Sequence, residues 1–165
     1  MKNQAQNINK LIDIVPSNYP ALMIAHFSDK DNLLIEELYK KAIKEDIEYQ
    51  INLLDEDAET LKHKYQNPLI KIIKFNLNRA KYMIQGKIYD FVFVTANIED
   101  IDSFLQKVHP IIKNSGNIII LLDKKQDTAI WLNLLEDRYF VATSVIDDLL
   151  DDKYVIISKK MHGWK

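Results

Sequence analysis

The segment from Tyr89 to Asp123 constrains the fold of this chain more than any other. It begins with the uninterrupted apolar run Phe91–Val94, which is typical of a strand buried on both faces of a parallel sheet. Apolar side chains recur at helical spacing from Ile101 to Ile112, and Ile118–Leu122 reads as a second buried strand. Gly116 is expected to close the helix, where a left-handed residue is favoured. Together these pieces predict a right-handed βαβ unit.

The same alternation of apolar runs and helical stripes extends along the rest of the chain. Residues 1–17 are expected to form an N-terminal helix and a connector, because a helical stripe precedes Pro16. Further strands are predicted at 21–27, 47–54, 69–75, 140–146 and 154–158, and further helices at 34–43, 57–65, 76–84 and 127–135. Residues 147–153 are too few for a crossover helix, so the last two strands should be antiparallel. The pattern predicts one α/β domain over residues 1–165, with a three-layer, doubly wound and mostly parallel sheet.

Composition narrows the classes of function. The net charge is −2, and only Arg79 and Arg138 are arginines among 22 basic residues. Base readout and bidentate phosphate contacts favour arginine, so the composition argues against a nucleic-acid reader. The chain has no cysteine, and no apolar run approaches the roughly 18 residues of a transmembrane helix. The polar N-terminus does not read as a secretory signal. We therefore expect a cytoplasmic protein without a membrane-spanning segment.

The histidines and aspartates show no metal-ligand pattern. His26, His63, His109 and His162 lack ligand spacing among themselves. The aspartates within 147–152 lack the alternation and the glycine of a calcium loop, and a solvated turn is expected there. The sequence also contains no P-loop, nucleophile elbow or HExxH motif. No metal site is predicted.

The order of these elements resembles that of the class I S-adenosylmethionine-dependent methyltransferases. The segment YDFVFV (89–94) is similar to the family's fourth strand, which an aromatic-Asp pair usually opens. The segment HPIIKNSGNIIILL (109–122) is similar to the turn that leads into the fifth strand, with Asn114–Asn117 in place of Pro-Gly-Gly. The resemblance implies a Rossmann-like sheet of order 3-2-1-4-5-7-6 with a C-terminal antiparallel hairpin. It also implies that a cofactor, if one is bound, is S-adenosylmethionine.

The turn after the first strand departs from the family. Family members carry a glycine-rich turn there, roughly Asp-x-Gly-x-Gly-x-Gly, because glycine lets the backbone approach the cofactor. Residues 25–32 contain no glycine. The resemblance places His26, Ser28 and Asp29 at the cofactor. His26 could contact a ligand or act as a base, and we favour the alternative that it fills an empty cofactor pocket. Ser28 could help to cradle an anion, and we favour a plain helix cap, supported by Asp31.

Four residues further along complete the candidate site. The resemblance implies that Asp55, after the second strand, would hold the ribose hydroxyls and that Asn76, after the third strand, would meet the adenine amine. Thr95 follows the fourth strand and is a further cofactor-binding candidate. Asn97 is the candidate catalytic residue, because methyltransferases on nitrogen often place Asn-Pro-Pro-Tyr there, although the prolines are absent from this chain.

The absence of glycine between Ala21 and Leu54 is the main functional signal. It predicts a methyltransferase-like domain with lost or weakened S-adenosylmethionine binding and no bound cofactor. Such a domain would be a non-catalytic interaction or scaffold protein that binds a protein partner or associates with itself. The alternative hypothesis is an active methyltransferase with a divergent first motif, in which catalysis is mainly alignment of the methyl donor with its nucleophile. A third hypothesis is another small ligand in the same crevice.

Overall fold

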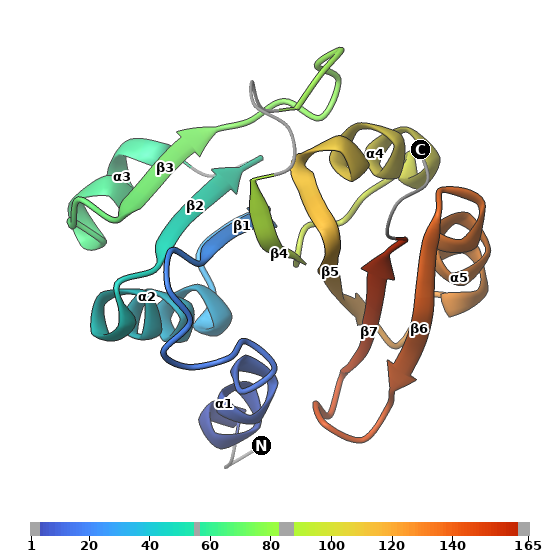
Figure 1. The fold of residues 1–165 in the computed structure, drawn as a ribbon, viewed down its shortest axis with the longest axis horizontal. Helices are drawn as coiled ribbons and strands as arrows, with labels where there is room; N and C mark the ends of the chain where they lie inside the picture. The colour runs from blue at the N-terminus through green and yellow to red at the C-terminus, as the bar shows by residue number, and fades with distance from the viewer. Residues whose placement is uncertain (1–3, 55–56, 83–87, 162–165) are drawn as a thin grey trace.

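A computed structural model describes residues 4–54, 57–82 and 88–161 of the chain. Its elements form one seven-stranded sheet with helices on both faces (Figure 1). The helices are α1 (Gln4–Ile12), α2 (Leu33–Glu45), α3 (Ala58–Lys64), α4 (Ile101–Val108) and α5 (Thr128–Asp137), and η1 (His109–Ile111) is a 3-10 helix. The strands are β1 (Met23–Ser28), β2 (Glu48–Leu53), β3 (Ile70–Lys74), β4 (Tyr89–Val94), β5 (Ile112–Asp123), β6 (Phe140–Ile146) and β7 (Lys153–Lys160).

The strand order confirms the predicted fold. The order is β3-β2-β1-β4-β5-β7-β6, and β1 to β5 pair in parallel. Strand β7 pairs antiparallel with both β5 and β6, which gives the predicted C-terminal hairpin. Lys71 and Lys74 lie on β3, an edge strand, where charged side chains discourage pairing with another chain. The order reverses between β1 and β4, so the carboxyl ends of these two strands form the topological switch point of the sheet.

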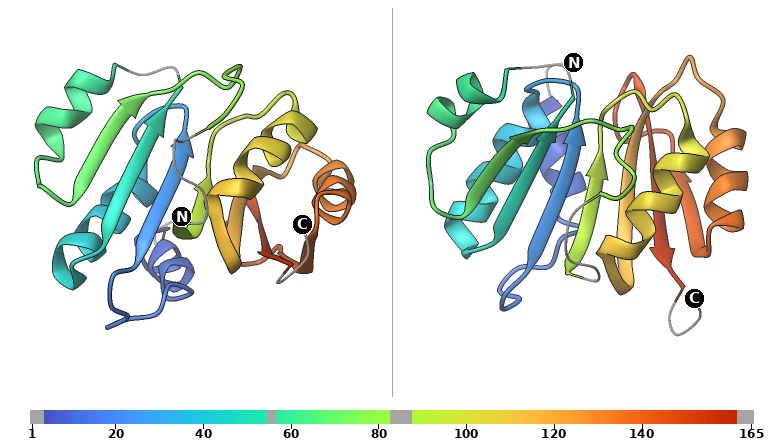
Figure 2. Two further views of the ribbon diagram at one scale, coloured as in Figure 1. Left: turned by 45° about the horizontal axis from the view of Figure 1, so that its top comes forward. Right: turned by 90° about the horizontal axis from the view of Figure 1, so that it is seen from above.

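Two apolar layers hold the helices against the sheet. One layer joins α1, α2 and α3 to one face of the sheet, and the other joins α4 and α5 to the opposite face (Figure 2). Alternation along β4 explains this division, since Phe91 and Phe93 belong to the first layer while Val92 and Val94 belong to the second. The continuous apolar run of β4 therefore packs on both faces, as predicted for a central parallel strand.

The structure corrects the role predicted for Gly116. This glycine lies within β5 instead of closing a helix, and the left-handed residue is its neighbour Ser115, with φ 67°. Gly116 is needed because the backbone of β4 passes close to it. A Cβ atom at this position would lie 2.9 Å from the carbonyl oxygen of Lys113 and 3.1 Å from that of Asp90. The close approach coincides with a bulge in the pairing of β4 and β5.

We expect Gly116→Ala to lower the free energy of unfolding by about 2–3 kcal/mol, because two of the clashing atoms belong to the backbone and cannot rotate away. Ser115→Gly is the matched control, and it should raise stability by about 1 kcal/mol by relieving the positive φ. Urea denaturation measures both values. Equal stability of Gly116→Ala and the native chain would contradict the close approach.

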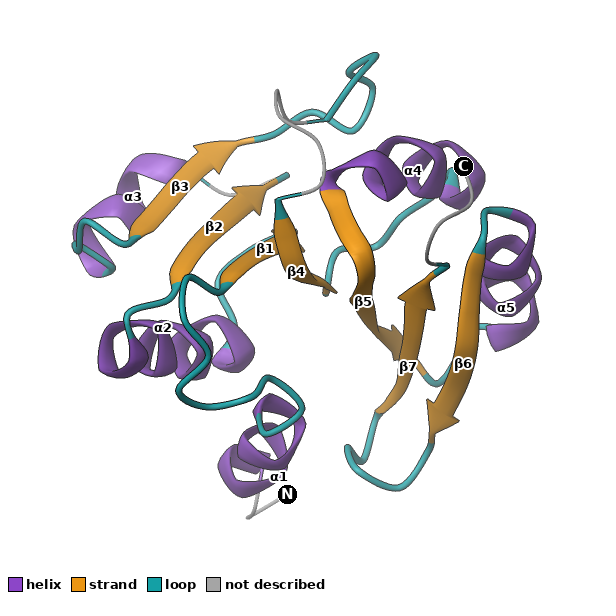
Figure 3. Cartoon of the chain, viewed as in Figure 1, coloured by secondary structure: helices purple, strands orange, loops and turns teal. Residues whose placement is uncertain are grey.

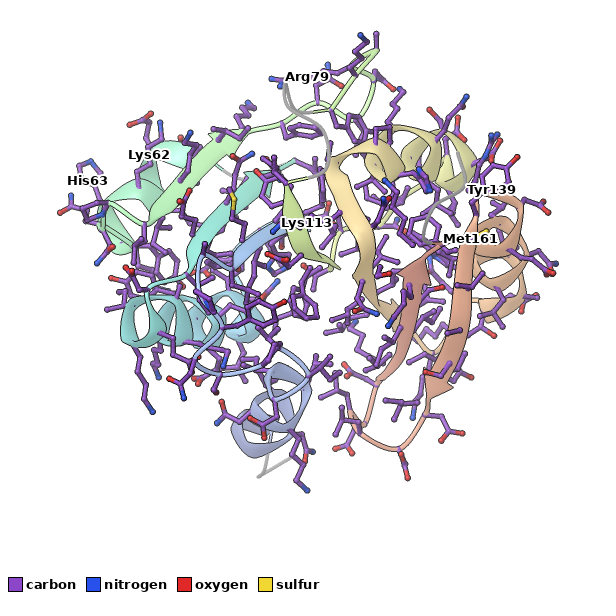
Figure 4. All side chains as sticks on the ribbon, viewed as in Figure 1. Lys62, His63, Arg79, Lys113, Tyr139 and Met161 are labelled. Carbon is purple, nitrogen blue, oxygen red and sulfur yellow. The ribbon has the colours of Figure 1, made fainter. Side chains whose placement is uncertain are left out.

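The segment after β3 also differs from the prediction. Residues 76–82 form turns instead of a helix, and residues 83 and 84 of the predicted helix lie outside the described residues (Figure 3). Local hydrogen bonds explain the turns, since the Asn76 side chain accepts from the amide of Asn78 at 2.8 Å. The hydroxyl of Tyr82 donates to the carbonyl oxygen of Leu77 at 2.7 Å. The guanidinium of Arg79 covers the ring of Phe75 at 4.9 Å from its centroid (Figure 4).

The first helix is shorter than the apolar stripe suggests. Helix α1 ends at Ile12, and single turns carry the chain to Val15, which remains buried. Pro16 therefore follows the end of the helix without causing it. In the part of the chain that the structure describes, every helix is too short or too polar to cross a lipid bilayer.

Candidate functional site

The candidate site lies at the switch point, where β1 and β4 end side by side. The structure brings together five of the predicted site residues here: His26, Ser28, Asp29, Thr95 and Asn97. Asn76 lies apart from them, exposed beyond the end of β3. Asp55 lies outside the described residues. Five of the seven predicted residues therefore lie together, and the roles assigned to them stay predictions.

His26 is fully buried between two hydroxyl groups. Its Nδ1 lies 2.7 Å from the hydroxyl oxygen of Tyr49 on β2, and its Nε2 lies 2.8 Å from the hydroxyl oxygen of Thr95. Burial lowers the pKa of His26 to about 3, so the ring is neutral at physiological pH. Burial also raises the pKa of Tyr49, which keeps that hydroxyl protonated.

The contacts of Thr95 fit a neutral His26 that carries its proton on Nε2. The amide of Asn32 donates to Thr95 Oγ1 at 3.2 Å, and the hydroxyl proton of Thr95 is directed to the carbonyl oxygen of Phe27 at 3.5 Å. In this arrangement Thr95 Oγ1 accepts from Nε2–H of His26, and Nδ1 accepts from Tyr49. A neutral histidine with both nitrogens engaged in this way is a structural link between β1, β2 and β4.

Asn32, not Ser28, caps helix α2. The Asn32 side-chain oxygen accepts from the amide of Ile35 at 2.9 Å, whereas Ser28 is the last residue of β1 and is buried. The Ser28 hydroxyl donates to the carbonyl oxygen of Lys30 at 2.6 Å and accepts from the Asn32 amide at 3.1 Å. The predicted cap was wrong because the turn is four residues longer than the sequence suggested. Asp31 instead accepts from the hydroxyl of Tyr65 at 2.8 Å.

Hydrogen bonds between the segment after β1 and the segment after β4 also close the switch point. The amides of Thr95 and Ala96 both donate to the carbonyl oxygen of Phe27, at 2.9 and 3.1 Å. The carboxylate of Asp29 then accepts from the amide of Asn97 at 3.0 Å. The segment after β1 is thus attached to the segment after β4 at three successive amides. These contacts join the two segments at the edge of the sheet where doubly wound folds ordinarily bind ligands.

Aromatic rings fill the region between the switch point and β3. Phe27 of β1 makes edge-on contacts with Phe75 and Phe104, in each case with 5.2 Å between ring centroids. Tyr82 packs against Phe75 at 4.9 Å, and burial raises its pKa to about 12. The turns that replace the predicted helix therefore bring a ring of their own into the second apolar layer.

Two clefts flank the closed switch point. The larger has a volume of about 860 Å³ and lies beyond the carboxyl ends of β4 and β5, beside the first turns of α4 and α5. The smaller has a volume of about 320 Å³ and lies among α1, the start of α2 and the turn before β7. Asp29 and Thr95 line both clefts, and Asn97 lines the larger one. In the residues with described positions, no group of three or more histidine, aspartate or glutamate side chains could hold a metal ion.

Sequence reasoning missed two members of the hydrogen-bonded cluster. Tyr49 lies in a predicted strand and Asn32 in the turn after the first strand, and the sequence predicts a role in the site for neither. A tyrosine in a strand covered on both faces must find a partner for its hydroxyl, which is the signal that could have indicated Tyr49. Asn32 is a favourable N-cap residue one position before the apolar stripe of α2, which was the available signal for the cap.

Comparison with known proteins finds similarity in structure but not in sequence. The sequence matches no protein-family model, and no curated protein matches it. Among solved structures, the fold of this chain is similar to that of the CMeT domain of the citrinin polyketide synthase. The TM-score is 0.76 at 10% identity, and the match covers 94% of this chain and 51% of that one. The fold is also similar to that of a TehB-like SAM-dependent methyltransferase from Corynebacterium glutamicum, with a TM-score of 0.72, 10% identity and coverage of 94% and 86%.

A third similar structure contains a bound cofactor. Phosphoethanolamine N-methyltransferase 2 from Haemonchus contortus, in complex with S-adenosyl-L-methionine, gives a TM-score of 0.73 at 12% identity, with coverage of 96% of this chain and 53% of that one. The chain thus spans about half the length of two of these three proteins. Identities this low establish the fold alone. Together with the strand order, they show that this chain has the Rossmann-like fold of the class I S-adenosylmethionine-dependent methyltransferases.

Proposed function

We propose that this chain is a methyltransferase-fold protein with lost or weakened S-adenosylmethionine binding that acts as a non-catalytic interaction or scaffold protein. The observation that carries the proposal is the closed switch point. We expect a cofactor bound over the ends of β1 and β4 to compete with the contact of His26 with Thr95 and the contact of Asp29 with Asn97. Each hydrogen bond given up costs about 0.5–1.5 kcal/mol, and more when a buried group is left unpaired.

The composition of the turn after β1 supports the same proposal. Without glycine, Ser28 and Asn32 carry side chains that hydrogen bond with each other, and the Asn32 amide also donates to Thr95. Asn32 also satisfies the amide of Ile35 in the first turn of α2. An amide that is already capped cannot donate to a ligand without losing its present partner. The donors that a glycine-rich turn would offer to a cofactor are therefore partly used within the protein.

A titration with S-adenosylmethionine and with S-adenosylhomocysteine tests this proposal. We expect the melting temperature to change by less than about 1 °C at millimolar ligand, because the switch point is already occupied. A ligand present at 100 times its Kd would add about 2.7 kcal/mol of stability. For a chain of this size that corresponds to a rise of roughly 5–10 °C. A rise of that order, with saturation in calorimetry, would overturn the proposal and favour the enzyme.

An active methyltransferase with a divergent first motif is the second candidate function. One observation favours it: the side chain of Asn97, the proposed substrate-orienting residue, lines the cleft of about 860 Å³ and accepts from the Gln126 amide at 3.3 Å. In that case Asn97→Ala should abolish methyl transfer while leaving S-adenosylmethionine binding unchanged. The cofactor titration described above decides between the two candidates before any substrate is known.

Strand β6 is the surface through which we expect the protein to associate with itself. It is an edge strand with no charged residue between Phe140 and Ile146, and Val141 and Val145 are 36% and 38% exposed. Charged side chains on edge strands normally prevent pairing between copies, as Lys71 and Lys74 do on β3. A bulge interrupts the pairing of β6 with β7 between Val141 and Ser144. The regular part of this edge strand is therefore the end that contains Ile146.

Val145→Lys should therefore weaken self-association by at least about tenfold without unfolding the protein, because the charge falls on an exposed edge. Sedimentation velocity over a range of concentrations measures the effect. Thr60→Lys on α3, an exposed position far from β6, is the matched control and should leave association unchanged. A native chain that stays monomeric at high concentration would exclude β6 as a self-association surface.

A further inference from the structure

The cleft beyond β4 and β5 has features that the closed switch point does not explain. Its volume of about 860 Å³ falls within the range of roughly 300–1,000 Å³ that is usual for small-ligand sites. It lies outside the carboxyl ends of parallel strands, the usual position for ligands in such sheets. Its walls come from the segment Ala96–Ile101 before α4 and the segment Asp123–Trp131 that leads into α5.

One wall of this cleft is apolar and partly exposed. Ile130 on the first turn of α5 is 54% exposed, although its helical spacing with Trp131, Leu134 and Leu135 is that of an inward-facing stripe. Trp131 is buried beside it, and Ile98 and Ile101 face the cleft from the α4 side. A ligand with an apolar body would cover the exposed side chain of Ile130. Removing such surface from water is favourable by about 25 cal/mol per Å².

The charged groups of the cleft are predominantly acidic. The carboxylates are Asp29, Glu99, Asp123 and Asp127, whereas the cations are Lys125 and Lys153. Lys153 Nζ lies 3.8 Å from Asp123 Oδ2, which is a loose ion pair. The backbone amide of Lys125 holds the pKa of Asp123 below its ordinary value, so that carboxylate is ionised at neutral pH.

Two of these carboxylates are fixed in orientation. Asp29 Oδ2 accepts from the amide of Asn97 at 3.0 Å, and Asp127 Oδ1 accepts from the amide of Ala129 at 2.9 Å. A carboxylate has two oxygens and can accept several hydrogen bonds, so each can also bind a further donor. An anion in the cleft would meet this excess of negative charge, whereas a cation would be attracted by it.

We propose that the cleft between the segments Ala96–Ile101 and Asp123–Trp131 binds a small organic cation, namely an ammonium group attached to an apolar body. The apolar body packs against Ile130, Ile98 and Ile101. The ammonium group lies toward the carboxylates of Asp29 and Asp127. The site shares Asp29 with the contacts that close the switch point and leaves them in place, so it does not require S-adenosylmethionine to bind.

A pair of ligands with one body and opposite charge tests the proposal directly. We expect 4-phenylbutylamine to bind to the full chain, and 4-phenylbutanoate to bind at least about tenfold more weakly. Calorimetry gives the affinities. Amide chemical shifts in a 15N-labelled protein give the location, and the amine should perturb residues 96–101 and 123–131. Equal affinities for the two ligands, no binding of the amine, or shifts confined to other regions would each overturn the proposal.

Substitutions of Asp127 and Ile130 separate the contribution of charge to amine binding from the contribution of apolar packing. Asp127→Asn keeps an oxygen that can cap α5 but removes the charge, and Ile130→Ser removes the exposed apolar side chain. Each should weaken binding of the amine about three- to tenfold while the melting temperature of the free protein stays within about 2 °C. Glu136→Gln removes an exposed charge from the same helix outside the cleft, and it should leave the affinity unchanged. Unchanged affinity in both Asp127→Asn and Ile130→Ser would overturn the proposal, even if the amine bound.

The outcome of this experiment is independent of the cofactor titration. A chain that does not bind S-adenosylmethionine but binds the amine fits both proposals. A chain that binds S-adenosylmethionine and also binds the amine overturns only the non-catalytic function. A chain that binds neither overturns only the cation site.

Discussion

Replacing Lys160 with methionine is expected to lower the free energy of unfolding by about 2–4 kcal/mol. Lys160 lies in β7 and is only 2% exposed. Its ammonium group donates to the carbonyl oxygens of His109 at 2.9 Å and Ile112 at 2.8 Å. Methionine keeps most of the apolar part of the side chain but has no donor, so both carbonyl oxygens lose this partner. Hydrogen bonds to charged groups contribute about 1.5–3 kcal/mol each.

The neighbouring residue supplies the control for this substitution. Lys159 is exposed on the same strand, and Lys159→Met should change stability by less than about 0.5 kcal/mol. Urea denaturation at pH 7 gives both values, and the melting temperature of Lys160→Met should fall by about 10 °C. Similar stabilities for the two variants would mean that Lys160 adds no more than an ordinary surface lysine.

The second large effect concerns His26 and pH. Its pKa of about 3 in the folded protein lies below the ordinary value of 6.5, because burial disfavours the charged ring. The unfolded chain therefore binds the proton more readily, and acid favours unfolding. The contribution of His26 to stability is complete above pH 6.5 and is lost progressively as the pH falls toward 3. The slope approaches about 1.4 kcal/mol per pH unit within that range.

His26→Asn should reveal this slope, because asparagine does not titrate. At pH 7 the variant should be less stable than the native chain by about 2–3 kcal/mol, since the hydroxyl groups of Tyr49 and Thr95 lose their present partner. The difference between the two proteins should shrink by roughly 2 kcal/mol between pH 6.5 and pH 4.5. His63→Asn on the exposed face of α3 is the control for loss of a histidine and should change stability at pH 7 by less than about 0.5 kcal/mol (Figure 4). A constant difference across this pH range would contradict the buried, neutral state of His26.

The sequence was sufficient for the sheet because the relevant signals are local. A run such as Phe91–Val94 has no polar alternation, and only a strand covered on both faces accepts such a run. The short link between β6 and β7 excludes a crossover, so their antiparallel pairing follows from chain length alone. Both inferences depend on neighbouring residues, and the strand order confirms them.

The errors occurred where distant residues decide the structure. Gly116 looked like a helix end, but its reason is the carbonyl of Asp90, which approaches from another strand. Ile130 has the spacing of a core residue, yet it faces a cleft formed with the segment before α4. The partner of His26 on β2 is 23 positions away in sequence. Contacts of this kind depend on how the strands are arranged, and helical or strand periodicity carries no information about them.

The central position of β1 has a consequence for how the chain folds. Strand β1 pairs with β4, and the hydrogen bond between His26 and Thr95 joins residues 69 positions apart. Forming such contacts requires closure of a long loop, which slows folding. During synthesis, β1 and β2 emerge well before β4, so one edge of β1 stays unpaired until residues near Val94 have left the ribosome. Over that interval the edge of β1 that the finished sheet conceals lacks its partner, and unpaired strand edges of this kind favour aggregation of incompletely folded chains.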